Sequence, residues 1–264
     1  MMRRAMLWLL AGLGSIALTV LAFVPALWMA PLLEAQTGGH LTLGDAQGTL
    51  WRGSAFIGAS ALVGDSPGGG DPVTPLLPGR FAWRLSPAIL LGRVDAELEN
   101  PAVLSQPVRI TGNWHDWQVS PSSAVMPAER LAALGAPLNT LQPSGRMRLS
   151  WQPLQLARLD GGVGMNGSVN LELSDMASRL SPLKPLGTYN LTFDWRGQQA
   201  SVKLETVKGS MLLNGTGVFA HGHLQFSGTA EAAAGQEEGL ANLLSLLGPR
   251  RRVGGRDVIA LEFK

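Results

Sequence analysis

Cysteine is absent from the 264-residue sequence, and charged residues make up only 15% of it. Without cysteine the chain can have no disulfide framework, no thiolate metal site and no cysteine nucleophile. Hydrophobic residues make up 45%, so the chain is too apolar and too lightly charged to be a disordered protein. We therefore expect a folded protein with a substantial core.

Charge is missing altogether from a long stretch near the N-terminus. Arg3 and Arg4 are the only charged residues before Glu34. Removing these two arginines from the 21 basic residues leaves 19, which the 19 acidic residues balance. A nucleic-acid-binding protein needs a basic face to neutralise phosphates. The neutral remainder of this chain therefore argues against a nucleic-acid partner.

The uncharged stretch, residues 5–33, is 29 residues long, and a helix that crosses a bilayer needs roughly 20. Trp8 and Trp28 are 20 residues apart, a separation that places the two indoles near opposite membrane interfaces. The two preceding arginines favour a cytoplasmic leader. The sequence thus predicts a leader and a single transmembrane helix over residues 1–33, with the bulk of the chain on the non-cytoplasmic side of the membrane.

A cleaved signal peptide is the alternative for this segment. Its apolar region spans about 7 to 15 residues and ends at small residues. The run here is longer, but small residues at 22–26 and 28–30 leave cleavage open. Both interpretations export the remainder of the chain.

Residues 34–264 show short runs of alternating apolar and polar residues, bounded by turn-forming residues. Such runs are typical of strands with one buried face. Echoes between these runs are consistent with stacked hairpins, although strand and turn chemistry alone also generates them. We predict a mainly β exported domain, an extended and curved antiparallel sheet with possible halves 38–120 and 143–264. The clearest strands are residues 108–110, 147–151, 169–173, 191–195, 202–205 and 258–263.

Two helices are predicted within this domain. Residues 127–137 begin with Pro and end in Gly and Pro, which suits a short connection between the halves. Residues 237–247 begin with two glutamates, place leucines at helical spacing and stop at Gly-Pro. Residues 64–79 hold four prolines and three consecutive glycines, so we expect a loop there. Residues 250–252, three arginines, are interpreted as a solvated turn.

Three motifs suggest chemistry, but each lacks the context that its chemistry needs. Ser66 lies in a Gly-x-Ser-x-Gly pattern without the strand and helix of a nucleophile elbow. Residues 162–167 match Gly-x-Gly-x-x-Gly, but a strand pattern follows, so a hairpin turn is predicted. His221 and His223 share a strand face without a third metal ligand. We therefore predict no enzyme, no catalytic or metal site and no cofactor.

The segment Gly48-Thr49-Leu50-Trp51-Arg52-Gly53 is the most distinctive in the domain. Gly48 and Gly53 flank Leu50 and Trp51 as in a tight turn between strands, where Trp51 buries its ring against the sheet. The same four residues could also form a partner-binding hot spot, because large aromatic side chains serve both roles. Solvent exposure of Trp51 distinguishes the two.

Several segments together resemble protein N of the bacterial type II secretion system. They are the apolar N-terminal segment and residues 41–55, 185–189, 204–217, 226–230 and 240–248, in that order. The resemblance implies a single-pass inner-membrane protein with a periplasmic domain. It also implies a non-enzymatic accessory role in moving folded proteins across the outer membrane, with other secretion proteins as partners.

Two other functions stay open. A long curved sheet with a continuous apolar face could carry a lipid or another apolar ligand. An exported hydrolase would need Ser66 to act as its nucleophile, and no base is apparent beside it.

Overall fold

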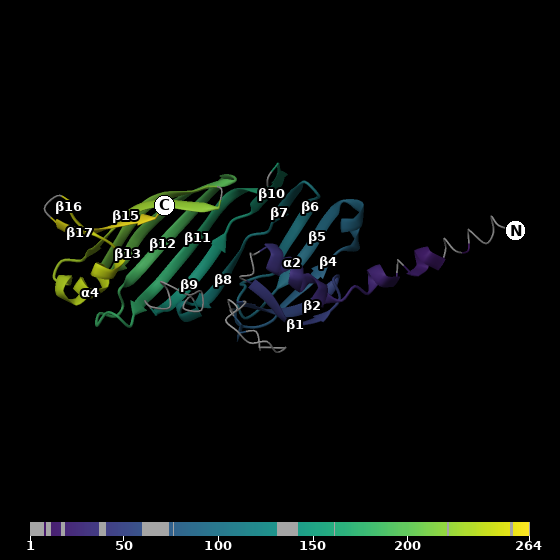
Figure 1. Cartoon of the computed structure of the whole chain (residues 1–264), viewed down its shortest axis with the longest axis horizontal. Helices are drawn as coiled ribbons and strands as arrows, with labels where there is room; N and C mark the ends of the chain where they lie inside the picture. The colour runs from purple at the N-terminus through teal and green to yellow at the C-terminus, as the bar shows by residue number, and fades with distance from the viewer. Residues whose placement is uncertain are drawn as a thin grey trace.

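The computed structural model (Figure 1) describes residues 8, 12–16, 19–36, 41–59, 74–75, 77–130, 142–160, 162–220, 222–253 and 256–263. Within these residues the chain forms one 17-stranded sheet. The strands are β1 (Leu41–Gly48), β2 (Arg52–Ala59), β3 (Thr74–Pro75), β4 (Phe81–Leu85), β5 (Arg93–Glu99), β6 (Val108–Asn113), β7 (Asp116–Val119), β8 (Ser122–Pro127), β9 (Pro143–Trp151), β10 (Leu154–Leu159), β11 (Gly162–Ser178), β12 (Gly187–Gly197), β13 (Gln199–Gly209), β14 (Met211–Ala220), β15 (His223–Ala232), β16 (Arg250–Val253) and β17 (Arg256–Phe263).

The sheet is an antiparallel meander in which strands pair with their neighbours along the chain. β1 pairs with β2, β2 with β3 and β4, and from β4 to β7 each strand pairs with the next. β7 and β8 then pair with β10 and β9, respectively. The 17-residue strand β11 spans both β9 and β10. Pairing continues in order from β11 to β15, then through β17 to β16.

Alternation along each strand separates an apolar face from a polar face. In β13, Val202 and Leu204 are buried, whereas Lys203 and Glu205 are exposed. Successive side chains of a strand point to opposite sides of a sheet, so a pattern of this kind fixes which side is apolar. The pairing register aligns apolar residues of neighbouring strands on the same side. This register is strongly specified, because a slip of one residue would move the apolar side chains of a strand to the opposite face.

The register produces long apolar rows across the middle of the sheet. One row contains Leu149, Leu171, Leu191 and Leu204 on β9, β11, β12 and β13. The next row on the same side contains Trp151, Val169, Phe193 and Val202. We call the side of the sheet that carries these two rows the apolar face.

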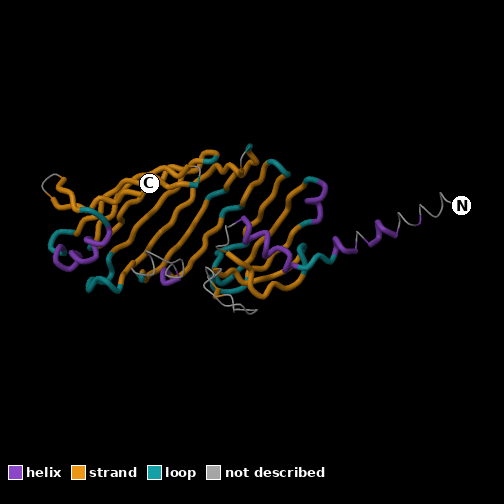
Figure 2. The backbone as a smooth tube through the Cα atoms, viewed as in Figure 1, coloured by secondary structure: helices purple, strands orange, loops and turns teal. Residues whose placement is uncertain are grey.

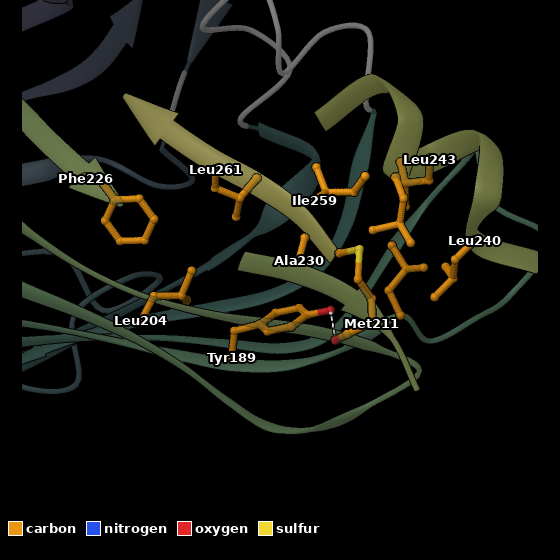
Figure 3. Close-up of a cluster of buried hydrophobic side chains, with 11 residues drawn as sticks. Tyr189, Leu204, Met211, Phe226, Ala230, Leu240, Leu243, Ile259 and Leu261 are labelled. Atoms are coloured by element: carbon orange, nitrogen blue, oxygen red, sulfur yellow. Dashed lines mark hydrogen bonds between the residues drawn. The ribbon is translucent and has the colours of Figure 1, made fainter. Parts of the chain in front are cut away.

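Helix α4 (Glu237–Leu247) covers the apolar face at the C-terminal end of the sheet. Figure 3 shows Leu240 and Leu243 of this helix beside the side chains of β12 to β17. Tyr189 lies beneath them, and its hydroxyl donates a 3.0 Å hydrogen bond to the Met211 carbonyl. Burial raises the pKa of Tyr189 above its ordinary value, so the phenol stays protonated.

The other described helices lie toward the N-terminal end. Figure 2 shows them in purple: η1 (Ala26–Trp28), α2 (Met29–Gln36) and η2 (Pro87–Leu91). η1 and α2 pack against β1, and η2 packs against β5. No helix in the described part of the chain makes an extended contact with strands β6 to β10. The apolar face of the central strands thus has no helical cover from these elements.

Most predicted elements are confirmed. All six strand segments predicted from alternation fall within strands, and the helix predicted at 237–247 has those bounds. The fold is mainly β, antiparallel and open, with few short helices. The predicted helix at 127–137 falls largely on residues outside the described ones. The same holds for the predicted loop at 64–79, except that Thr74–Pro75 forms the short strand β3 against β2. Among the described residues, no helix is both long and apolar enough to cross a membrane.

Two predictions were wrong. Residues 162–167 begin strand β11 instead of forming a hairpin turn, because their glycines serve close packing within the sheet. A Cβ on Gly167, for example, would lie 2.7 Å from the Leu154 side chain. The three arginines at 250–252 belong to strand β16, which pairs with β17. A short run of like charges gave no alternation from which that strand could be predicted.

The packing of α4 yields a stability prediction. Leu240 is fully buried in the core beneath the helix, whereas Leu246 of the same helix is exposed. We expect Leu240→Ala to lower the free energy of unfolding by about 2–5 kcal/mol, because it removes buried methyl groups and leaves a cavity. Leu246→Ala should change it by less than about 0.5 kcal/mol. Denaturant unfolding of the two variants checks this, and equal effects would contradict the assigned packing.

Candidate functional site: the N-terminal junction

The turn between β1 and β2 is built tightly around two glycines. Gly48 has φ +86°, a conformation that glycine adopts without strain. The Thr49 amide donates to the Arg52 carbonyl at 2.8 Å and closes the turn. At Gly53 a Cβ would lie 2.5 Å from the Trp83 ring, so only glycine fits there. Both glycines selected from the sequence therefore have a structural reason.

This turn holds the end of the N-terminal helical segment, whose described helical residues include 12–16 and 19–22. The Leu50 amide donates to the Val24 carbonyl at 2.8 Å. The Trp51 indole N–H donates to the Leu21 carbonyl, also at 2.8 Å. Pro25 forms a β-bridge with Thr49. We call these contacts the N-terminal junction.

The junction gives Trp51 a role that sequence reasoning missed. The last carbonyls of a helix have no partner within the helix, and the Trp51 indole supplies one at Leu21. Trp51 is half-buried, and Trp83 beside it donates to the Leu50 carbonyl at 3.1 Å. Trp51 and Leu21 are 30 residues apart, so no local pattern could have predicted their contact. Leu50, the fourth residue that the sequence pointed to, holds the junction through its backbone amide and carbonyl.

A hollow of about 800 Å³ opens at the junction. Its lining combines apolar residues of the helical segment and η2 with charged residues of β2, β4, β5 and β6. It includes Leu21, Ala22, Phe23, Trp51, Arg52, Arg84, Pro87, Leu90, Asp95, Glu97 and Arg109. Glu97 lies 3.9 Å from Arg84 and 3.5 Å from Arg109. Because its charges are largely paired, the hollow suits mixed contacts with a partner more than capture of a single ion.

An ion pair braces β1 next to the junction. Arg80 donates to the Asp45 carboxylate and to the Asp45 carbonyl, and its guanidinium lies 4.7 Å from the centre of the Phe56 ring. The hydrogen bond from Arg80, helped by one from Gln47, holds the pKa of Asp45 below its ordinary value. Asp45 is therefore ionised at neutral pH and keeps the bulge of β1 tied to the start of β4.

The remaining sequence candidates do not assemble into a site. Trp8 and Trp28 are both exposed. His223 begins β15, while Ser66 and His221 lie outside the described residues. Within the residues that the structure describes, no three metal-ligating side chains come together.

The apolar face also satisfies its own polar atoms. The Trp151 indole donates to the Ser120 carbonyl at 2.9 Å. The Thr206 hydroxyl donates to the Leu213 carbonyl at 2.8 Å and accepts from the Leu213 amide. Polar groups paired in this way are not available to orient a polar ligand. This face is therefore suited to apolar contacts.

Comparison with protein families identifies the chain. The family model described as type II secretion system (T2SS), protein N, matches residues 39–258. The chain belongs to the type II secretion system protein N family. Comparisons with curated proteins and with solved structures found no match. Membership supports an accessory role in type II secretion and an association with the cell envelope, as the resemblance in the sequence implied.

The N-terminal junction yields a second prediction. Trp51→Phe keeps an aromatic ring but removes the donor to Leu21. We expect the free energy that holds the junction closed to fall by about 1 kcal/mol, because one hydrogen bond is lost. Hydrogen exchange at the Leu50 amide, which donates to the Val24 carbonyl, should then be roughly fivefold faster. Trp114→Phe is the matched control, since its indole donates to Ile89 in another turn. Unchanged exchange at Leu50 in Trp51→Phe would show that the indole does not hold the junction.

Proposed function

We propose that this member of the protein N family is a non-enzymatic accessory component of the type II secretion system, anchored in the inner membrane. The span would lie within residues 5–23, short of the predicted end at residue 33, because Pro25 forms a bridge with Thr49 and both η1 and α2 pack against β1. Residues 34–264, together with η1 and α2, would lie in the periplasm, where they bind other inner-membrane secretion components. The match to the family over residues 39–258 carries this proposal. The uncharged 29-residue run and the two arginines before it support the anchor and its direction.

The edges of the sheet are the surfaces best suited to a protein partner. Among the described residues, β16 pairs only with β17, and it pairs only as far as Ile259. The backbone of β17 beyond that residue, through Leu261 to Phe263, has β15 on one side. An unpaired strand edge can accept a strand from another protein. The four selected junction residues, Gly48, Leu50, Trp51 and Gly53, lie at the other end of the sheet, beside the hollow.

Co-purification from intact envelopes tests this function. We expect the full chain to co-purify with other inner-membrane secretion components, and a chain lacking residues 38–264 to lose them. A chain whose residues 1–20 are replaced by an unrelated apolar transmembrane helix is the matched control and should keep them, because it retains the junction contacts of Leu21, Val24 and Pro25. Absence of association with the full chain, or association retained by the anchor alone, would reject the proposal.

The part of the apolar face that no described helix covers favours one second candidate, a carrier of lipid or another apolar ligand. Two apolar rows cross β9 to β13 in register, and α4 covers only the C-terminal end of this side. Leu171 and Phe193 in these rows are half-buried and do not belong to the core cluster under α4. Acyl chains need an apolar surface of this kind and no polar partner.

Lipid analysis of purified full-length protein tests the second candidate. We expect a diacyl phospholipid to co-purify, and Phe193→Gln on the apolar face to reduce it severalfold. Thr192→Gln is the matched control, because its side chain lies on the opposite face of the same strand. Circular dichroism and melting temperature establish that both variants fold. Equal lipid content in both variants and the unaltered protein would reject carriage on this face.

A further inference from the structure

Three large apolar side chains are exposed together at one corner of the sheet. η2 connects β4 to β5 and presents Leu90, 50% exposed, and Leu91, 89% exposed. Trp114 lies in the turn between β6 and β7 and is 52% exposed. Its indole N–H donates to the Ile89 carbonyl at 2.7 Å, which joins the two turns. We call Leu90, Leu91 and Trp114 the corner patch.

The corner patch is held by ordered local structure. The Ser86 hydroxyl caps the start of η2 by accepting from the Ala88 amide at 3.3 Å. Gly92 ends it in the left-handed conformation at φ +86°, with its amide bonded to the last turn. A short turn capped at both ends displays its side chains in a defined direction. The exposure of Leu91 is therefore a fixed feature of the surface.

The corner patch lies next to the N-terminal helical segment. Leu90 and Pro87 line the same hollow as Leu21, Ala22 and Phe23. The junction fixes this arrangement through the hydrogen bond from Trp51 to Leu21. Figure 1 agrees: β4 and β5 stand at the end of the sheet from which the N-terminal segment extends. The two apolar surfaces are thus continuous around one end of the molecule.

The helical segment displays the same chemistry as the corner patch. Leu13, Ile16, Val20 and Phe23 follow one another at helical spacing, and all four are exposed. Such a stripe is unfavourable in water and favourable in a hydrocarbon phase. Leu90 lines the hollow together with the end of this helix, so an apolar phase around the helix would also be close to Leu90. A bilayer can cover both surfaces at once, because the helix that enters it begins beside the patch.

We infer that the corner patch inserts into the interfacial layer of the bilayer that the N-terminal helix enters. Leu90 and Leu91 enter the acyl boundary, and Trp114 lies at the level of the headgroups, where indole is most favourable. Arg93 begins β5 directly after the turn and is exposed, so its guanidinium can reach lipid phosphate. This inference rests on the membrane anchor of the proposed function.

The second membrane contact would fix the orientation of the sheet. A single helix leaves a periplasmic domain free to rotate about the point of attachment. Contact at the corner patch, on the far side of the hollow from the helix, removes that freedom. The β4–β5 end of the sheet then faces the membrane and the α4 end points away from it.

Site-specific fluorescence tests the inference in the full chain, which has no native cysteine to interfere. A single cysteine at Leu91, labelled with an environment-sensitive nitrobenzoxadiazole dye, is reconstituted in vesicles of phosphatidylethanolamine and phosphatidylglycerol with spin-labelled lipid as quencher. Val207→Cys on β13 and Leu246→Cys on α4, each replacing a side chain 64% exposed, are the matched controls. Ile16→Cys reports on the anchor itself.

We expect blue-shifted emission and lipid quenching at position 91 severalfold above those at 207 and 246, with strong quenching at 16. Quenching at 16 but not at 91 would overturn the inference and leave the anchor intact. Absence of quenching at 16 would overturn the anchor and the inference with it. Equal quenching at 91, 207 and 246 would indicate unspecific adsorption and reject the corner patch. A blue shift at 91 without quenching would mean that the patch is buried against protein of the same chain or a second copy of it, and would also reject the inference.

Discussion

A single-layered sheet with one apolar face must find a cover for that face, and this requirement shapes the rest of the molecule. At the C-terminal end the cover is internal: α4 lays Leu240 and Leu243 over β15 and β17. Beyond the reach of α4, the rows through Leu171 and Phe193 stay half-buried. Burial of apolar area is the dominant stabilising term in folding, so the long central part gains less from it than the capped end.

Meander topology makes such an elongated sheet possible. Most strands pair with their sequence neighbours, as from β12 to β15, so each added strand satisfies the backbone groups of the previous edge. The outermost strands, β1 and β16, each pair on one side only among the described residues, and each edge is protected in a different way. β1 has α2 beside it and a bulge at Asp45, whereas β16 carries consecutive arginines, a common defence of an exposed edge.

How far the sequence predicts this structure depends on the distance over which each feature is encoded. Alternation around Leu191 and the leucine spacing of α4 are local signals, and both gave correct elements. The glycines at 48 and 53 also predicted the turn that they form. The indole of Trp51 on the Leu21 carbonyl and the indole of Trp114 on Ile89 join distant segments. No periodicity records contacts of that kind, and they determine the position of the candidate site.

The N-terminal junction attaches the helical segment rigidly to the sheet. A helix tied to the domain through a flexible linker would leave an accessory protein free to sample all orientations. Trp51 and Leu50 instead bind the helix end directly to the β1–β2 turn. Any force or partner that reorients the N-terminal helical segment therefore acts on the first hairpin of the sheet. Because that hairpin and β17 belong to one hydrogen-bonded sheet, a partner at the far edge contacts the same continuous body.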